Sequence, residues 1–168
     1  MEIRKAAMED LAQLKDMYKQ IVQNMNENDI QIWDDIYPCE FFEDDINKEQ
    51  LYVLTEKNEI LSAFVLCETH SGERKVHWNM DSARTVYLDR LGVNINHRNK
   101  GMGNLSLDRA KEIAGSNGFD CLRLFVVDKN IPAIRLYEKY GFIKAEGIYE
   151  EVFDDAFVLR EYGYEIKI

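Results

Sequence analysis

The sequence predicts a mixed α/β domain whose sheet is not purely parallel. Strand-like and helix-like segments alternate along the chain, and several neighbouring strand-like segments are separated only by short turns typical of hairpins. Hydrophobic residues make up 46% of the 168 residues and charged residues 31%, a composition with enough apolar side chains for a core and unlike that of disordered chains. The length fits a single domain over residues 1–168.

The first part of the chain predicts a strand, then helices, then a hairpin. Apolar residues that recur at a spacing of three to four predict an amphipathic helix, and a region that mixes aromatic and acidic residues around Pro38 predicts an irregular helix with a loop. Two β-rich runs flank the turn-forming Lys57-Asn58-Glu59, which predicts the hairpin. The expected elements are a strand at 2–6, a helix at 11–25, an irregular helix and loop at 26–50, and strands at 51–56 and 60–69.

The second part predicts two strand–helix pairs followed by further strands. A helix opens at a Gly-Met-Gly sequence, and a shorter helix begins at a proline and ends at a glycine, the residues that favour those two ends. The expected elements are a polar loop at 70–83, a strand at 84–95, a helix from 101 to about 115–118, a strand at 122–127, a helix from Pro132 to Gly141, and two strands within 142–168.

Several patterns that the sequence lacks narrow the class of protein. The longest apolar run, Ala63–Cys67, is far shorter than the roughly 20 residues needed to cross a bilayer. The N-terminal residues have no apolar segment after a basic start, so no signal peptide is predicted. The three cysteines form no close pair and no zinc-ligand spacing. We therefore expect a cytoplasmic protein with no disulfide framework, no metal and no membrane partner.

Charge is spread unevenly along the chain, whose formal net charge is −10. Residues 1–60 hold 6 Lys/Arg and 15 Asp/Glu, a net charge of −9, whereas residues 90–144 hold 10 Lys/Arg and 5 Asp/Glu, a net charge of +5. The global acidity argues against nucleic acid or an anionic membrane as a partner, because both bind clustered basic residues. The basic stretch permits a polyanionic ligand, and the acidic start permits a cationic one.

The segment Leu91–Asn104 joins a predicted strand to a predicted helix through a basic turn that contains glycines. Glycine lets the backbone approach a ligand closely, and the free N–H groups at a helix start point toward anions. Arg98 and Lys100 add positive charge at the same place. The segment is neither a P-loop nor a dinucleotide fingerprint, whose third glycine is replaced by Ser106. If only these residues are considered, the alternative to an anion-binding loop is an ordinary glycine-rich turn between a strand and a helix.

Two motifs resemble those of the GNAT family of acetyltransferases. The family's coenzyme A loop, [Gln/Arg]-x-x-Gly-x-[Gly/Ala], is similar to Arg98-Asn99-Lys100-Gly101-Met102-Gly103, and Val93 stands at the family's apolar fourth-strand end. The family segment Asn-x-x-Ala-x-x-Leu-Tyr-x-x-x-Gly-Phe resembles residues 130–142. The order of elements fits across nearly the whole chain. Ile95, where many relatives have Pro, and Asn104, where an aliphatic residue is common, depart from the pattern without removing a group that the loop needs.

The resemblance implies a mixed, mostly antiparallel and splayed sheet of about seven strands flanked by about four helices. It also implies acetyl-CoA as the co-substrate, held by main-chain groups of the strand end and the loop. Final strands in this family often exchange or pair, so a homodimer is an open possibility. The residues that the resemblance assigns to acetyl-CoA are Leu91, Val93, Arg98, Asn99, Lys100, Gly101, Met102, Gly103, Asn104, Asn130 and Ala133.

Acetyl transfer to an amine requires a held thioester, a neutral amine and a proton for the departing thiolate. The resemblance places the phenol of Tyr137 near the sulfur, so Tyr137 is the predicted general acid. On periodicity alone, Tyr137 would join Ala133, Leu136 and Tyr140 on the buried face of a helix. Asn130 could contact the cofactor; alternatively, it serves only as the N-cap of that helix.

Asp89 is the candidate general base, because alternation along its strand directs it to the same side as the residues at the strand end. A carboxylate whose pKa is raised by burial could take the ammonium proton directly or through water. The alternative for Asp89 is an ion pair with Arg84 or Arg90, and Glu68 and His70 are weaker candidates for the base.

Trp33, Asp34 and Tyr37 are the candidate residues for the acceptor. They resemble a Trp…Tyr-Pro segment in a bacterial subgroup of the family, where relatives build the acceptor-side wall, and cations bind well among aromatic faces and carboxylates. The alternative is a helix with an apolar inner face and an acidic outer face. The predicted function is acetyl transfer from acetyl-CoA to a primary amine of a small, cationic molecule. A non-catalytic coenzyme A-binding module, or acetylation of a protein lysine or N-terminus, are the alternatives.

Overall fold

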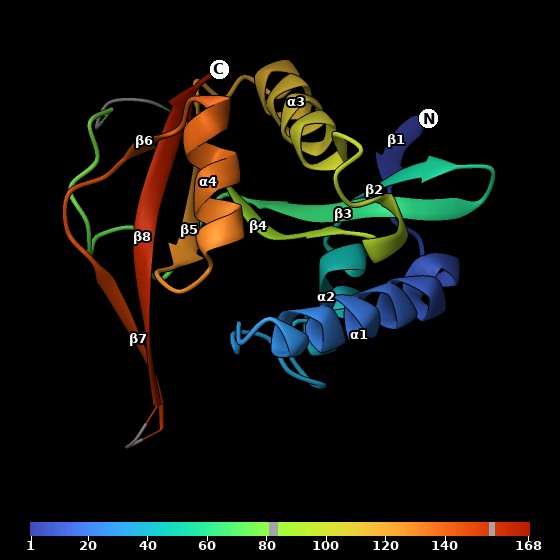
Figure 1. The fold of residues 1–168 in the computed structure, drawn as a ribbon. Helices are drawn as coiled ribbons and strands as arrows, with labels where there is room; N and C mark the ends of the chain where they lie inside the picture. Colours follow the sequence, from blue (N-terminus) through green and yellow to red (C-terminus); the bar gives the residue numbers. More distant parts are fainter. Residues whose placement is uncertain (81–83, 155–156) are drawn as a thin grey trace. The chain divides into compact units, whose positions relative to one another are not determined.

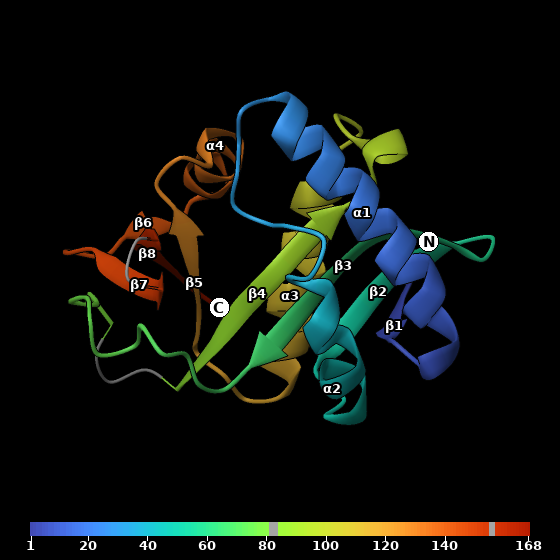
Figure 2. The same cartoon turned by 90° about the horizontal axis from the view of Figure 1, so that it is seen from below.

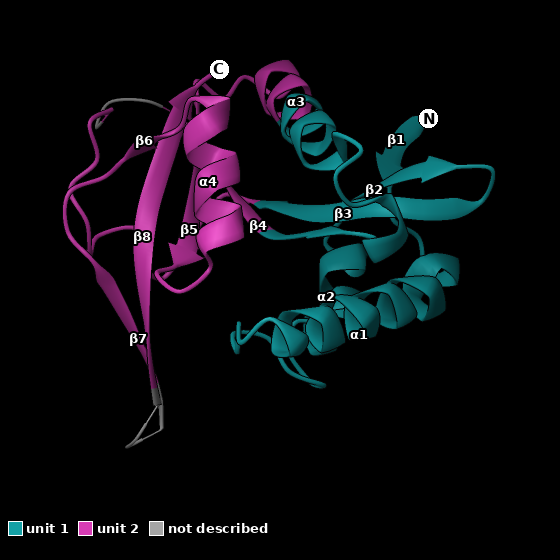
Figure 3. Cartoon of the chain, viewed as in Figure 1, with its two compact units in different colours: residues 1–66, 90–110 teal, residues 67–89, 111–168 magenta. Residues whose placement is uncertain are grey.

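A computed structural model describes residues 1–80, 84–154 and 157–168 of the chain (Figure 1). These residues divide into two compact units: unit 1 comprises residues 1–66 and 90–110, and unit 2 comprises residues 67–89 and 111–168 (Figure 3). The strands β3 (Glu59–Cys67) and β4 (Thr85–Val93) and the helix α3 (Met102–Ser116) contribute residues to both units.

The strands join in the order β1-β2-β3-β4-β5-β8-β6, and β7 pairs with β8. Strands β4 and β5 pair in parallel, whereas the pairs β1–β2, β2–β3, β5–β8, β6–β8 and β7–β8 are antiparallel, which confirms the mixed, mostly antiparallel fold class. The C-terminal region contains three strands where the sequence predicts two, because a strand of two residues follows α4. The remaining elements are β1 (Glu2–Lys5), α1 (Leu11–Glu27), α2 (Phe42–Asn47), β2 (Leu51–Glu56), β5 (Cys121–Val127), α4 (Ile131–Tyr140), β6 (Ile143–Lys144), β7 (Tyr149–Asp154) and β8 (Phe157–Lys167).

Unit 1 is built on the antiparallel strands β1, β2 and β3. The predicted hairpin is present, and Lys57 and Asn58 form its two-residue turn with φ of 48° and 68°. Helices α1 and α2 lie on one face of these strands and the first half of α3 on the other (Figures 1 and 2). The ring of Tyr18 from α1 packs edge-on against Phe42 of α2, with centroids 4.7 Å apart, and both residues are fully buried.

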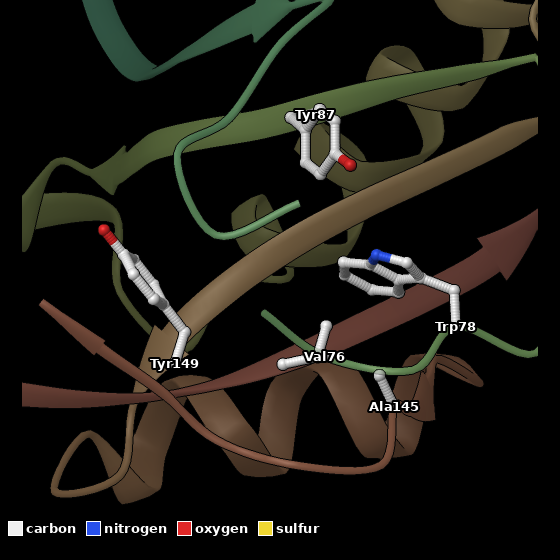
Figure 4. Close-up of a cluster of buried hydrophobic side chains, with 5 residues drawn as sticks. All are labelled: Val76, Trp78, Tyr87, Ala145 and Tyr149. Atoms are coloured by element: carbon white, nitrogen blue, oxygen red, sulfur yellow. The ribbon is translucent and has the colours of Figure 1, made fainter. Parts of the chain in front are cut away.

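Unit 2 is built on β5, which pairs with the first half of β4 on one side and with β8 on the other. Helix α4 lies over β5 and β8, and the Tyr164 hydroxyl donates to Glu138 at 2.8 Å (Figure 1). A second buried cluster contains Tyr87, Tyr149, Val76, Trp78 and Ala145 (Figure 4). The predicted polar loop at 70–83 therefore supplies Val76 and Trp78 to a core; its residues 81–83 lie outside the described residues.

Helix α4 begins and ends where the sequence predicts, because local signals suffice at both ends. Pro132 occupies the first turn, the Asn130 side chain accepts a hydrogen bond from the Ala133 N–H at 3.3 Å, and Gly141 closes the helix with φ of 108°.

Among the described residues, no helix is long and apolar enough to cross a membrane.

Candidate functional site

The last residues of β4 are held in place by side chains from α1 and α2, all within unit 1. Arg90 has φ of 52°, an uncommon value for a residue other than glycine. The Tyr18 hydroxyl donates to the Arg90 carbonyl at 2.5 Å. The Arg90 guanidinium forms a two-pronged pair with Asp45, with Nη2–Oδ1 at 2.9 Å and Nε–Oδ2 at 3.1 Å. Two contacts therefore hold Arg90 in its uncommon backbone conformation: one to its carbonyl, from Tyr18, and one to its side chain, from Asp45.

Gly92 is required because Tyr18 also lies against the strand at this position. A Cβ at position 92 would lie 2.6 Å from the ring of Tyr18, so only glycine lets the strand pass this close to α1. Two residues further on, the Asn94 N–H donates to the Leu61 carbonyl at 2.9 Å, which ties the strand end to β3. Leu91 and Val93 remain partly exposed on this fixed backbone.

The loop that follows exposes its basic residues. Arg98, Asn99 and Lys100 are all exposed, and the Lys100 ammonium donates to the Asn96 carbonyl at 2.9 Å, whereas the Arg98 guanidinium donates to Asn24 of α1. Asn99 and Gly101 adopt positive φ values of 59° and 81°. A Cβ at Gly101 would meet no atom within 4 Å, so the backbone conformation, rather than crowding, favours glycine there.

The start of α3 is pinned onto the strands of unit 1. Met102 packs with Leu54 and Leu61, and the buried hydroxyls of Ser106 and Ser62 lie 2.7 Å apart. The first turn of a helix leaves its N–H groups without intrahelical acceptors, and these groups attract anions. A rigid helix start behind an open, basic, glycine-containing turn therefore fits a diphosphate group, which the predicted residues Gly101, Met102, Gly103 and Asn104 would hold.

Tyr137 lies on the buried side of α4, in unit 2, with an exposed fraction of 8%. Its ring meets Phe142 edge-on at 5.6 Å, so it contributes to packing as the periodicity indicates. Burial, and secondarily the charge of Asp89, raise the pKa of the Tyr137 phenol above its usual value of 10.0. The phenol therefore keeps its proton at neutral pH, as a proton donor must.

The arginines considered as partners for Asp89 also interact with other residues. Arg90 pairs with Asp45, and the Arg84 guanidinium donates to the Asn117 carbonyl at 3.1 Å. Of the weaker candidates for the base, Glu68 is exposed. His70 stacks on Phe125 with ring centroids 4.4 Å apart, and its Nδ1 accepts from the Gly72 N–H at 3.0 Å.

Glu151 and Glu161 are titratable groups that the sequence analysis missed. Burial and the charges of Glu151 and Asp89 raise the pKa of Glu161 to about 8, and burial with the charge of Asp89 also raises the pKa of Glu151. The sequence signal that could have identified Glu161 is its spacing from Gly163 and Glu165, because alternate residues of a strand lie on the same face. No group of three or more His, Cys, Asp or Glu in the described part of the chain could hold a metal ion.

The three candidate acceptor residues lie in an irregular segment of unit 1, before α2. The Trp33 ring is 5.6 Å from the Tyr18 ring, and Tyr37 meets Phe41 edge-on at 5.7 Å. The carboxylate of Asp34 accepts from the N–H groups of Ile36 and Tyr37, both at 2.7 Å, so it already closes a turn. No helix forms here, and the alternative of a helix with one apolar face does not describe Trp33, Asp34 or Tyr37.

Residues 11–142 match the family model described as the acetyltransferase (GNAT) family, and the chain belongs to this family. Over 103 residues it is 30% identical to YwnH of Bacillus subtilis (strain 168), whose name provisionally assigns it as a phosphinothricin acetyltransferase. That alignment covers 61% of this chain and 59% of the relative, so the similar region spans less than two thirds of either protein.

Solved structures share the fold over nearly the whole chain. An acetyltransferase of the GNAT family from Listeria monocytogenes 4b F2365 matches with a TM-score of 0.74 at 17% identity, covering 99% of this chain and 94% of that one. The yncA protein of Salmonella typhimurium, provisionally described as an acetyltransferase and solved with its cofactor acetyl-CoA, matches with a TM-score of 0.66 at 19% identity, covering 99% and 92%. At these identities the likeness shows the fold alone.

Proposed function

We propose that this chain transfers the acetyl group of acetyl-CoA to a primary amine of a small molecule, by direct attack within a ternary complex. The observation that carries the proposal is the basic, glycine-containing loop in front of the pinned start of α3, in a chain of the GNAT family. Acetyl-CoA supplies an activated thioester and an anionic diphosphate. No metal is proposed.

The residues of unit 1 would bind and position the co-substrate. The N–H groups of residues 101–104 would accept the diphosphate, with Arg98 and Lys100 adding charge and Asn99 shaping the turn. A main-chain N–H near Val93 would stabilise the negative charge that develops on the thioester oxygen. Fixing Arg90 through Tyr18 and Asp45 preorganises this strand end, so little reorganisation is needed during the reaction.

The residues of unit 2 would move protons. Tyr137, which is buried and protonated, is proposed as the acid that protonates the departing thiolate. Asp89 is proposed as the base that takes the proton from the attacking amine, directly or through water. Asn130 and Ala133 are proposed to contact acetyl-CoA, although the Asn130 side chain also caps α4.

The acceptor is proposed to be cationic, because residues 1–60 carry a net charge of −9 and include Trp33, Asp34 and Tyr37. A second candidate, phosphinothricin, is favoured by the 30% identity to a relative whose name includes it. A protein lysine or N-terminus is the third. A coenzyme A-binding module without turnover is the non-enzymatic alternative.

The deciding experiment follows free thiol released from acetyl-CoA in the presence of a panel of acceptors. The panel contains mono- and diamines, basic amino acids, aminosugars, phosphinothricin and a lysine-containing peptide. Thiol release that depends on one class of amine supports the enzyme and identifies its substrate class. Tight binding of acetyl-CoA with no release for any acceptor would support the binding module instead, and activity confined to neutral or acidic amines would refute the cationic acceptor.

A further inference from the structure

The loop proposed to bind acetyl-CoA is attached at both of its ends to the start of β3, within unit 1. Before the loop, Asn94, the residue that follows β4, donates its N–H to the Leu61 carbonyl at 2.9 Å. After the loop, the buried hydroxyl of Ser106 in α3 lies 2.7 Å from that of Ser62, and Met102 packs with Leu61. Adjacent residues of one strand therefore hold both the strand end and the helix start.

The side chain of Asn94 adds a second link between β3 and the loop, because both ends of its amide are used. Its Nδ2 donates to the Ile60 carbonyl at 3.0 Å and to Oε1 of Glu59 at 3.4 Å. Its Oδ1 accepts from the Asn96 N–H at 3.0 Å, which closes a turn at the beginning of the loop. One side chain thus joins the loop turn to the strand beneath it.

The turn that Asn94 closes has further contacts of its own. The His97 N–H donates to the Asn94 carbonyl at 2.9 Å, and the His97 Nε2 lies 3.1 Å from Oε1 of Glu59. The Lys100 ammonium donates to the Asn96 carbonyl at 2.9 Å. Residues 94–100 therefore form a structured turn whose base is Asn94 and whose attachment is the hairpin of β2 and β3.

We infer that Asn94 is a positioning residue that sets the spacing between the two halves of the acetyl-CoA site; this inference rests on the proposed function. The thioester is proposed to lie near Val93, directly before Asn94, and the diphosphate at residues 101–104, directly after the turn. A ligand that spans both places binds with full affinity only if their separation is already correct in the free protein. Asn94 would contact neither group and would act through the turn and β3.

This role separates two ligands that a general loosening of the site would affect alike. Acetyl-CoA would occupy both halves, whereas its nucleotide half, adenosine 3′-phosphate 5′-diphosphate, would reach residues 101–104 without reaching Val93. Removal of the Asn94 amide should therefore weaken the binding of acetyl-CoA and spare the binding of the nucleotide.

NMR titration of the isotope-labelled chain with each ligand measures both affinities without any turnover. We expect Asn94→Ala to weaken acetyl-CoA binding about 10-fold, the effect of losing one or two hydrogen bonds, and to change the affinity for the nucleotide less than about twofold. Asn94→Ser keeps a neutral oxygen that can accept from the Asn96 N–H but is too short to reach Ile60, so it should also weaken acetyl-CoA binding. Asn96→Ala, which alters an exposed side chain of the same turn, is the matched control and should leave both affinities unchanged.

Amide exchange in the free protein provides a readout that needs no ligand. We expect the Asn96 N–H to exchange faster in Asn94→Ala than in the unaltered chain, because its acceptor is gone, and to stay largely protected in Asn94→Ser. Equal exchange in Asn94→Ala and the unaltered chain would contradict the turn on which the inference depends.

Unchanged acetyl-CoA affinity in Asn94→Ala would overturn the inference and leave the proposed function standing. An equal loss for acetyl-CoA and the nucleotide would also overturn it, as would full acetyl-CoA affinity in Asn94→Ser, since the turn alone would then suffice. If Asn94→Ala does not fold, the same comparison of the two ligands in Asn94→Ser decides. Failure of the unaltered protein to bind acetyl-CoA would reject the proposed function and the inference with it.

Discussion

The two units handle polar groups in opposite ways. In unit 1 the residues proposed to bind acetyl-CoA are exposed basic side chains and backbone N–H groups, and Arg98, Asn99 and Lys100 all face solvent. In unit 2 the proposed proton donor Tyr137 is buried and the proposed base Asp89 is partly exposed, and burial is the largest cause of the raised pKa of Tyr137 and of Glu161. Holding an anion requires accessible donors, whereas shifting a pKa requires the removal of water. The predictions below test this separation of binding from proton transfer.

The largest effect is expected from Tyr137→Phe. Loss of the proton donor should lower kcat by about 100- to 10,000-fold. Acetyl-CoA affinity should stay nearly unchanged, because the loop of unit 1 is untouched. Steady-state kinetics with calorimetric binding measures both quantities, and Tyr140→Phe on the same helix is the control. An unaltered kcat across pH, under conditions where chemistry limits the rate, would remove Tyr137 from the mechanism.

Asp45→Asn should show that the conformation of the β4 end in unit 1 depends on a buried charge. The variant removes the charge of Asp45 that pairs with the Arg90 guanidinium, whose side chain is 12% exposed, and we expect the free energy of unfolding to fall by about 3 kcal/mol. Urea denaturation measures the change. Asp44→Asn, which removes an exposed pair with Lys48, should leave the stability unchanged. Equal effects in the two variants would contradict a special role for the Arg90 pair.

Gly103→Leu should weaken acetyl-CoA binding by about 100-fold, or roughly 2.7 kcal/mol, because a large side chain at the start of α3 would occupy the space of the diphosphate. Gly103→Ala is the matched control, since the family pattern permits either glycine or alanine, and its affinity should stay close to that of the unaltered protein. The measurement is the calorimetric Kd. Retained affinity in Gly103→Leu would defeat the assignment of the loop.

The last prediction concerns a dependence of stability on pH in unit 2. The pKa of Glu161 is about 8 in the folded chain and 4.5 when unperturbed, so the folded state keeps its proton to higher pH than the unfolded state does. The stabilising contribution is therefore complete below pH 4.5 and is lost as pH rises through about 8, with a slope of at most about 1.4 kcal/mol per pH unit. Urea denaturation from about pH 5 to pH 8 should show a flatter profile for Glu161→Gln than for the unaltered protein. Parallel profiles would mean that Glu161 is not perturbed.

Local signals account for much of the fold that the sequence predicts. The hairpin at Lys57 and Asn58, the helix opened near Gly101 and the helix from Ile131 to Tyr140 each depend on residues that are close in the chain. The two-residue strand β6 has no such signal, because its conformation is imposed by pairing with β8. The burial of Val76 and Trp78, in a segment that reads as a polar loop, likewise depends on contacts with distant residues.

The sequence by itself determined the family motifs, the basic loop and the position of Tyr137 on a helix, because each is encoded by spacing within a short segment. Only the tertiary structure decided which charges have partners. Arg90 pairs with Asp45, which lies 45 residues away in the chain. Glu165 pairs with Asn79 and Arg123, whereas the charges that act on Glu161, on the same strand face, are those of Glu151 and Asp89. The energy of a charge depends on the groups and the water around it in three dimensions, and the order of residues along the chain does not specify those surroundings.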